Sequence, residues 1–319
     1  MGINVLSLFD GISCGRVALE RAGIDINKYY ASEVDEKAIE VTIKHYPNTI
    51  QIGDVKELNF KDFKDIDLLI GGSPCQDLSG CNIINKGLEG DRSKLFFEFI
   101  KALKTVNPKF YLFENVGSMT NDNMKIISSY FKREPIRINS NLVSPQSRDR
   151  YYWTNIPNIS IPKDKNIFVK DILEKEVPIK YFLKKDYIYI PKQQKHKSKS
   201  GLVYKCGIIS KNKWLEDGKN LSRKFSQGNR VYSIYGKSCT INANAGGLGG
   251  KSGLYYLEDG KEFSKNNIRR LTPLETERLQ NLPDNYTEGL NETNRYKCIG
   301  NGWTVDVIAH IFRHLPKEI

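Results

Sequence analysis

Two reactive side chains follow apolar runs of the sequence, at points where strands are expected to end. Cys75 lies shortly after the run 67–70, and Glu114 comes directly after the next predicted strand. A thiol becomes a nucleophile when its thiolate is stabilised, which an acidic neighbour such as Glu114 would not do. Arg148 and Arg150 are the candidate cations for that task. Taken alone, Cys75 fits a small buried structural residue better than a nucleophile.

A second set of polar groups follows the first three apolar runs. Gly11 and Gly15 form a glycine turn after the first run, and Glu33 and Asp54 follow the second and third. Glu33 lies 33 − 11 = 22 positions after Gly11, about where a carboxylate binds the ribose hydroxyls of a nucleotide. Asp54 is a candidate acceptor for an adenine amino group. Because the turn holds no lysine or arginine, an adenosine-containing ligand fits better than a diphosphate; the alternative is an ordinary turn with two surface acids.

These residues must be positioned by a regular framework, and the apolar patterning indicates one. Up to about residue 155, short apolar runs alternate with amphipathic stretches. The predicted strands are 3–9, 29–32, 50–52, 67–70, 110–113 and 151–154. The predicted helices are 16–22, 35–45, 93–105 and 124–131. This alternation favours an α/β fold with a Rossmann-like, doubly wound, mostly parallel sheet, whose strand ends meet at one edge.

The composition and hydrophobic periodicity of the sequence change between about 176 and 268. This stretch is rich in lysine, aromatic residues and glycine, and it shows no long amphipathic helix. Helical patterning returns at 272–280 and 305–315. We therefore expect a smaller, irregular module inserted into the first domain. The first predicted domain comprises 1–175 and 293–319, and the inserted module comprises 176–292.

Composition narrows the class of protein. The 319 residues include 49 lysines and arginines against 37 aspartates and glutamates, a net charge of +12, which slightly favours a nucleic-acid partner over a lysine-rich solvated surface. No apolar run approaches the ~18 residues of a membrane span, and the N-terminus lacks the features of a signal peptide. The six cysteines show no C-x-x-C spacing and the four histidines form no cluster, so we expect a cytoplasmic protein without a metal site.

Eight short motifs, in order and suitably spaced from residue 5 to about 310, resemble those of the DNA (cytosine-5) methyltransferase family. They are Phe9-Asp10-Gly11, Gly72-Ser73-Pro74-Cys75-Gln76, Asp91-Arg92-Ser93-Lys94-Leu95-Phe96, Glu114-Asn115-Val116, Gln146-Ser147-Arg148-Asp149-Arg150, Arg270-Leu271-Thr272-Pro273-Leu274-Glu275, Arg278-Leu279-Gln280 and Gly300-Asn301-Gly302. Jointly these motifs are highly specific, and they reverse the assessment of Cys75 in favour of a nucleophile.

The resemblance implies a mechanism and a cofactor. Cys75 would add to C6 of cytosine and so make C5 nucleophilic, while Glu114 protonates N3 and Arg150, together with Arg148, holds the base. The implied methyl donor is S-adenosylmethionine. The implied cofactor-binding residues are Phe9, Gly11, Ile12, Glu33, Val34, Asp54, Pro74, Leu95, Asn301 and Gly302. Ser13 departs from the family, many of whose members have glycine there, and resembles the animal de novo enzymes.

A cytosine inside a duplex must leave the base stack before it can react. The stretch from Gln227 to Thr240 is similar to the family's target-recognition region. The resemblance implies that Gln227 stabilises the orphan guanine, that Thr240 contacts the DNA near the flipped nucleotide, and that Arg230 belongs to the same surface. The expected partner is duplex DNA, with a monomeric enzyme and a possible cognate restriction endonuclease.

Two other functions compete with DNA methylation. A related branch of the family methylates cytosine in transfer RNA, but it is compact and lacks a large recognition module, whereas the residues between 176 and 268 favour DNA. A catalytically silent DNA-binding relative is the other alternative. The presence of Cys75, Glu114 and Arg150 argues against a silent protein.

Overall fold

The computed structural model describes residues 2–73, 95–183, 188–197, 204–210, 227–243, 249–250, 252–257 and 267–317. The chain divides into two compact units. The first comprises Met1–Asn139, Asp149–Pro162 and Val305–Ile319, and the second comprises Ser140–Arg148 and Lys163–Thr304. In the described parts of both units, no helix is long and apolar enough to cross a membrane.

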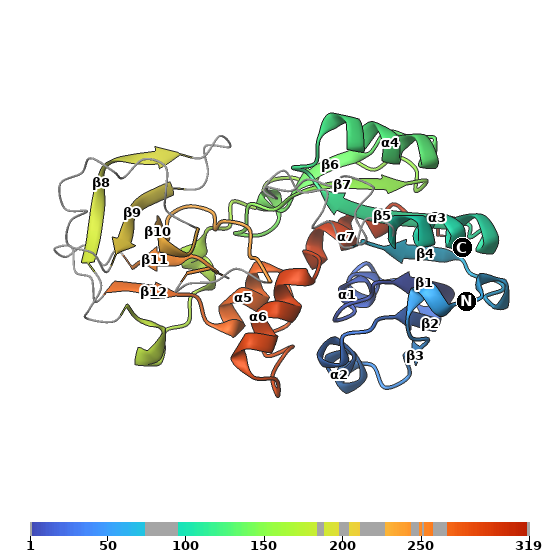
Figure 1. Ribbon diagram of the computed structural model, residues 1–319, viewed down its shortest axis with the longest axis horizontal. Helices are drawn as coiled ribbons and strands as arrows, with labels where there is room; N and C mark the ends of the chain where they lie inside the picture. Colours follow the sequence, from blue (N-terminus) through green and yellow to red (C-terminus); the bar gives the residue numbers. More distant parts are fainter. Residues whose placement is uncertain are drawn as a thin grey trace. The chain divides into compact units, whose positions relative to one another are not determined.

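A seven-stranded sheet forms the centre of the first unit (Figure 1). Its strands are β1 (Ile3–Leu8), β2 (Ile26–Ser32), β3 (Ile50–Gln51), β4 (Leu68–Gly71), β5 (Phe110–Val116), β6 (Ile136–Asn139) and β7 (Asp149–Thr154). They lie in the order β3-β2-β1-β4-β5-β7-β6. The pairs among β1 to β5 are parallel, whereas β7 pairs antiparallel with both β5 and β6. The predicted doubly wound, mostly parallel sheet is confirmed.

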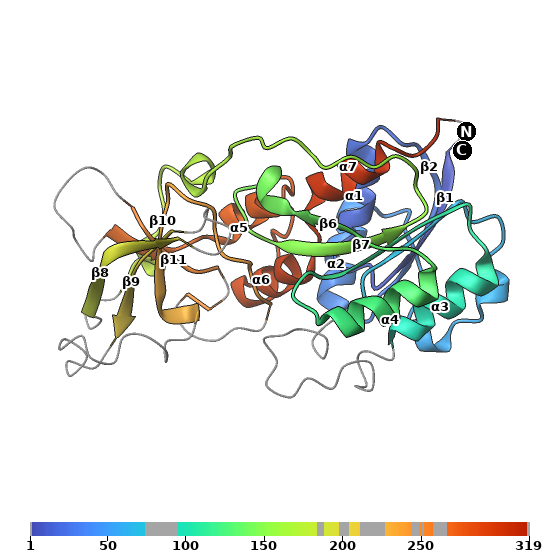
Figure 2. The same cartoon turned by 90° about the horizontal axis from the view of Figure 1, so that it is seen from above.

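Helices cover both faces of this sheet, as Figure 2 shows, with α3 and α4 on one face and α1 and α7 on the other. The helices of this unit are α1 (Cys14–Arg21), α2 (Glu36–His45), α3 (Leu95–Val106), α4 (Asn121–Phe131) and α7 (Val305–Phe312), with short 3-10 helices η1 (Val55–Glu57) and η2 (Phe60–Asp62). Phe96 and Phe99 of α3 and Phe131 of α4 pack with Phe113 and Trp153 of the sheet in one buried cluster. This aromatic core fixes the strands whose ends carry the candidate site.

The second unit contains a five-stranded sheet in the order β12-β11-β10-β9-β8. Its strands are β8 (Ile188–Lys197), β9 (Tyr204–Ser210), β10 (Arg230–Ser233), β11 (Leu254–Tyr256) and β12 (Ile268–Arg270). The described residues of this region thus include a sheet that the sequence patterning did not predict. Three of the strands have only three or four residues, too few for an alternating pattern to show in the sequence, and they are held by buried side chains such as Val231 and Ile268.

The described residues of the second unit also form helices and short 3-10 helices. They are η4 (Ser140–Leu142), η5 (Val169–Ile172), η6 (Ile179–Tyr181), η8 (Gln227–Asn229), α5 (Pro273–Leu279) and α6 (Glu292–Asn301). Thr272 caps α5 in a reciprocal capping box with Glu275, and Pro273 occupies the first turn. The carboxylate of Glu275 also forms a buried two-point ion pair with Arg269, at 2.6 Å for each contact.

The compact units differ from the domain bounds expected at 175 and 293. Residues 163–175 and 293–304 lie in the second unit. The reason is a shared core: Val169 of η5 and Ile299 of α6 pack in the same buried cluster as Tyr232 and Leu271. The target-recognition role of 176–292 stays a prediction.

Candidate active site

The turn between β1 and α1 has an unusual backbone. Phe9, Gly11 and Ser13 all have positive φ, at 59°, 61° and 55°. A Cβ atom added at Gly11 would meet nothing within 4 Å, so the turn leaves open space beside that residue. Ser13 keeps this conformation although it is not glycine. Its hydroxyl donates to a carboxylate oxygen of Asp10, which holds the turn closed.

Glu33 joins this turn to the end of β2. Its Oε2 accepts a hydrogen bond from the Gly11 N–H at 2.8 Å, and its Oε1 accepts from the N–H groups of Val34 and Asp35 at 2.7 and 2.9 Å. Val34 itself is exposed. A carboxylate held by three main-chain donors keeps a fixed direction at the strand end. The predicted neighbourhood of Gly11 and Glu33 is therefore present in the first unit.

Other predicted cofactor residues of the first unit lie at the same edge of the sheet or support it. Asp54 follows β3, and its Oδ1 accepts from the Lys56 N–H at 3.0 Å at the start of η1. Phe9 and Leu95, the first residue of α3, both pack against the aromatic core. Ile12 is fully buried, so it supports the turn from below. Pro74 and Cys75 lie outside the described residues.

A cluster of hydroxyl groups around the partly buried carboxylate of Asp10, in the same turn, was not predicted. Asp10 accepts hydrogen bonds from Ser7 Oγ at 2.6 Å and from the Tyr29 hydroxyl at 2.7 Å, besides the one from Ser13. Desolvation raises the pKa of Asp10 above its ordinary value, with a smaller contribution from Glu33, while the bonds from Ser13, Ser7 and Tyr29 oppose this shift. The signal in the sequence was the position of Asp10 inside the first motif, but its partner Tyr29 lies 19 residues away.

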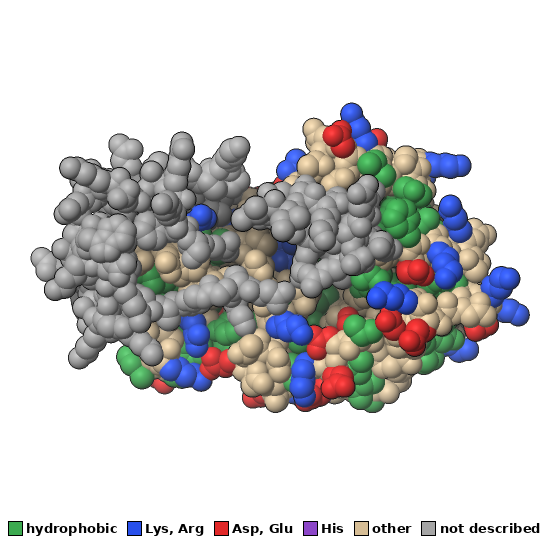
Figure 3. All heavy atoms as spheres, in the orientation of Figure 1, with side chains coloured by type: hydrophobic (Ala, Val, Ile, Leu, Met, Phe, Trp, Pro, Cys, Tyr) green, Lys and Arg blue, Asp and Glu red, His purple; other side chains and the backbone are tan. Residues whose placement is uncertain are grey.

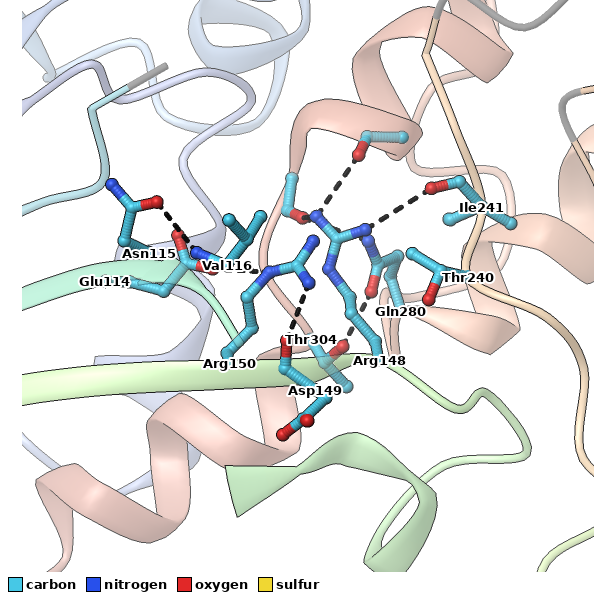
Figure 4. A network of polar contacts seen from close by, with 12 residues as sticks. Glu114, Asn115, Val116, Arg148, Asp149, Arg150, Thr240, Ile241, Gln280 and Thr304 are labelled. Atoms are coloured by element: carbon cyan, nitrogen blue, oxygen red, sulfur yellow. Dashed lines mark hydrogen bonds and ion pairs between the residues drawn. The ribbon is translucent and has the colours of Figure 1, made fainter. Parts of the chain in front are cut away.

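Glu114 and Arg150 form an ion pair near the carboxyl end of β5, inside the strand and not after it as predicted, because pairing with β7 extends β5 to Val116 (Figure 4). Arg150 Nε lies 2.7 Å from Glu114 Oε1, and the two side chains are only 13% and 11% exposed. A terminal nitrogen of Arg150 also donates to the main-chain oxygen of Asp149 at 2.8 Å. The predicted acid and its cationic partner are thus brought together within the first unit.

Arg148 belongs to the second unit and has different partners. Its terminal nitrogens donate to the main-chain oxygens of Ile241 at 3.4 Å, Gly300 at 3.2 Å and Gly302 at 3.0 Å (Figure 4). The side chain is buried. These contacts join three separate segments of the chain, which favours a supporting role for Arg148 over direct contact with a base.

The remaining predicted contacts also lie in the second unit. Thr240 donates through its hydroxyl to the Ser147 main-chain oxygen at 2.6 Å, and Arg230 begins β10. Asn301 is the exposed last residue of α6, and Gly302 caps that helix. Gln227 begins η8, but its side chain lies outside what the structure describes.

Charge is distributed over the described surface without one dominant patch on the face seen in Figure 3. Lysine and arginine side chains lie there among aspartates and glutamates. Among the described residues no group of three or more histidine, cysteine, aspartate or glutamate side chains is placed to hold a metal ion.

Comparison with known proteins identifies the family. The model of the family described as C-5 cytosine-specific DNA methylase matches residues 3–317. The chain belongs to this family. It is 28% identical to the type II methyltransferase M.HhaI of Haemophilus parahaemolyticus over 338 aligned positions, covering 100% of this chain and 95% of that protein. It is 31% identical to the orphan methyltransferase M.Rho11sI of Bacillus phage rho11s over 308 positions, covering 81% of this chain but only 61% of the phage protein.

A solved structure supports the fold independently. The Entamoeba histolytica methyltransferase EhMeth superposes with a TM-score of 0.71 at 18% identity, covering 98% of each chain. At that identity the likeness shows the fold. Within the family, the arrangement of Glu33, Glu114 and Arg150 at the strand ends marks this edge of the sheet as the candidate active site.

Proposed function

We propose that the protein transfers a methyl group from S-adenosylmethionine to C5 of cytosine in duplex DNA. The observation that carries the proposal is the Glu114–Arg150 pair, a largely buried carboxylate and guanidinium 2.7 Å apart at a strand end of a chain whose family acts on DNA cytosine. The relatives M.HhaI and M.Rho11sI are named as methyltransferases and support the same reaction type.

The residues of the first unit fit an adenosine-containing cofactor. Gly11 leaves open space, and the Glu33 carboxylate beside it suits the two ribose hydroxyls, with Asp54 at the next strand end for the adenine amine. Arg16, the basic residue next to the turn, donates instead to Thr49 and Asn48 at 2.6 and 2.7 Å. A diphosphate would therefore lack a cation at the turn.

The remaining cofactor contacts are proposed from the family motifs. Phe9, Ile12, Val34 and Leu95 would line or support the adenosine site, and Pro74, Asn301 and Gly302 would complete it. When bound, S-adenosylmethionine supplies an electrophilic methyl carbon on its sulfonium.

Glu114 and Arg150 would act on the target base. Glu114 in its protonated form would donate to N3 of cytosine, so that the ring can accept electrons during nucleophilic attack. Arg150 would hold the O2 side of the base and offset the charge that develops there. The main-chain bond of Arg150 to Asp149 and its contact with Glu114 limit the rotamers of both side chains before the base arrives.

The proposed covalent step uses Cys75, on the strength of its sequence motif. The thiolate of Cys75 would form a bond to C6, and the electrons of the C5–C6 double bond would move to the C4–C5 bond. Those of the C4–N3 double bond would move to N3, which takes the proton from Glu114. C5 would then take the methyl group. Loss of the C5 proton to a base would restore the C5–C6 double bond and break the bond between C6 and the Cys75 sulfur. N3 would return its proton to the Glu114 carboxylate.

Duplex DNA is the proposed substrate, with the cytosine turned out of the stack. Gln227, Arg230 and Thr240 are the proposed DNA contacts. Arg230 begins β10 of the second unit's sheet, and Thr240 is held by its hydroxyl bond to the Ser147 main-chain oxygen. The competing substrate is transfer RNA. We further propose a monomeric enzyme, since one recognition module serves one flipped base.

A single incubation tests the proposal. Wild type and Cys75→Ala are each mixed with labelled S-adenosylmethionine and either duplex DNA of bacterial origin or bulk transfer RNA. We expect label in DNA with wild type and none with Cys75→Ala. Label in transfer RNA alone would overturn the DNA assignment, and no label with any nucleic acid would favour the silent relative.

A further inference from the structure

Two buried glutamine side chains of the second unit share a closed network of hydrogen bonds. Gln146 and Gln280 are fully buried, and Gln146 Nε2 donates to Gln280 Oε1 at 3.1 Å. The two residues are 134 positions apart in the sequence. The polar atoms of a buried amide side chain need hydrogen-bond partners. The other partners of Gln146 and Gln280 therefore show which segments of the chain these two side chains connect.

Gln280 faces the end of α6 and the segment that follows it. Its Nε2 donates to the main-chain oxygens of Ile299 at 3.0 Å and Gly302 at 2.9 Å. Its Oε1 accepts from the Thr304 hydroxyl at 2.7 Å. One side chain therefore fixes three points around Asn301 and Gly302, the proposed cofactor residues of this unit.

Gln146 faces the segment that carries the proposed DNA contact. Its Oε1 accepts from the Ile241 N–H at 3.0 Å, one residue after Thr240. Thr240 is held in turn by its bond to the Ser147 main-chain oxygen. The position of Thr240 is thus set on both sides by the segment 146–147.

Arg148 also bonds to both of the segments that the two glutamines contact. It donates both to Ile241 and to the carbonyls of Gly300 and Gly302, so it touches the same two segments as the glutamine pair (Figure 4). The main chains of these segments are also in direct contact. A Cβ atom added at Gly300 would lie 2.7 Å from the main-chain nitrogen of Ala243. Any residue other than glycine would therefore clash with Ala243 at this position.

We propose that Gln146, Gln280 and Arg148 are positioning residues that couple DNA binding to cofactor binding. The inference rests on the proposed function for the roles of Thr240 and of Asn301 and Gly302. A fully satisfied buried network is rigid, so a shift of the segment at 240–241 when DNA binds is passed to the segment at 300–302. Coupling free energies between sites typically change affinity by about 5- to 150-fold, and the effect is reciprocal.

The test measures the dissociation constant of S-adenosylhomocysteine by calorimetry, without DNA and with a saturating duplex fragment that the wild type methylates. The ratio of the two constants is the coupling. We expect a ratio of about 5 or more for the wild type. Gln280→Met, which removes four network bonds with little change in volume, should bring the ratio close to one. Thr304→Val removes a single hydroxyl bond and should lower the ratio in the same direction, in a protein that folds even if Gln280→Met does not.

Thr276→Val is the matched control. The Thr276 hydroxyl is buried and donates to the Thr272 main-chain oxygen at 2.7 Å within α5, outside the network. It should lower the melting temperature while leaving the ratio at the wild-type value. A ratio that stays at the wild-type value in Gln280→Met and Thr304→Val would overturn the proposal.

The result for the wild type distinguishes failure of the proposed coupling from failure of the proposed function. A wild type that methylates DNA but shows a ratio of one contradicts the coupling alone. A wild type that neither binds S-adenosylhomocysteine nor methylates DNA contradicts the proposed function as well.

Discussion

Nε of Arg150 lies 2.7 Å from Oε1 of Glu114, and the two residues come from neighbouring antiparallel strands, β7 and β5. In the register of these strands Arg150 is opposite Val116, two residues beyond Glu114, so the pair lies on one face of the sheet. Strand pairing therefore sets the distance between the proposed acid and its cation before any substrate binds.

Removing the acid function of Glu114 should abolish most activity. Glu114→Gln keeps the size of the side chain but can no longer transfer a proton to the base. We expect methyl transfer to fall by on the order of 10²- to 10⁴-fold, the usual contribution of a general acid. Single-turnover rates with saturating S-adenosylmethionine measure this effect.

Arg137→Gln is the matched control for that variant. Arg137 of β6 forms a two-point ion pair with Asp149 of β7, the strand that also carries Arg150, but the Arg137 side chain is 55% exposed. Its loss should leave the rate within about twofold, since exposed ion pairs contribute little. Equal losses in Glu114→Gln and Arg137→Gln would indicate that the first acts only by disturbing the sheet.

Replacing Ser13 by glycine should destabilise the protein less than replacing it by alanine. Ser13→Ala loses the bond to Asp10 and keeps the side-chain clash at φ 55°, so we expect a destabilisation of about 1–2 kcal/mol. In Ser13→Gly the relief of that clash offsets the lost bond, and stability should stay within about 0.5 kcal/mol of wild type. Urea unfolding gives both values. An alanine variant as stable as the glycine variant would show that the turn is not strained at Ser13.

Asp10 should make stability depend on pH in a defined direction. Because burial raises the pKa of Asp10 in the folded state above 3.8, the folded protein binds this proton more tightly than the unfolded chain. Its contribution is present below pH 3.8 and is lost as the pH rises through the folded-state pKa. The free energy of unfolding of wild type minus that of Asp10→Asn should therefore decrease between pH 4 and pH 7. A difference that increases with pH would contradict the direction of this shift.

The buried pair of Arg269 and Glu275 should dominate the stability of the second unit. Arg269→Met leaves the Glu275 carboxylate, fully buried, without its counter-ion. We expect a loss of about 3–5 kcal/mol, measured by urea unfolding. Lys37→Gln, which breaks the exposed pair with Glu40, should leave the unfolding free energy unchanged. A small loss for Arg269→Met would mean that water reaches Glu275 in solution.

The first unit could be predicted well because its strands are buried on both faces. Ile3–Leu8 and Leu68–Gly71 therefore read as mostly apolar runs, and the residues after them mark the strand ends. Glu33 was found by that rule. β6 could not be predicted because it has only four residues, two of which, Arg137 and Asn139, are polar. The strand is defined mainly by its pairing with β7.

The parts of the site that could not be predicted depend on contacts between residues that are distant in the sequence. The Asp10 cluster needs Tyr29, and the glutamine network joins Gln146 to Gln280, so neither could be read from local patterns. Arg148 shows the same limit. Its motif pairs it with Arg150, yet its contacts lie with Ile241 and Gly302 in the other unit.

A trapped covalent adduct shows whether Cys75 attacks cytosine in DNA. Duplex DNA in which 5-fluorocytosine replaces cytosine is incubated with the protein and S-adenosylmethionine, and the covalent product is digested and mapped by mass spectrometry. Fluorine at C5 cannot leave as a proton does, so the bond to the enzyme should persist. We predict a DNA-linked peptide containing Cys75, formed only with S-adenosylmethionine present. An adduct that still forms with Cys75→Ser, or one that maps to another cysteine, would contradict the account.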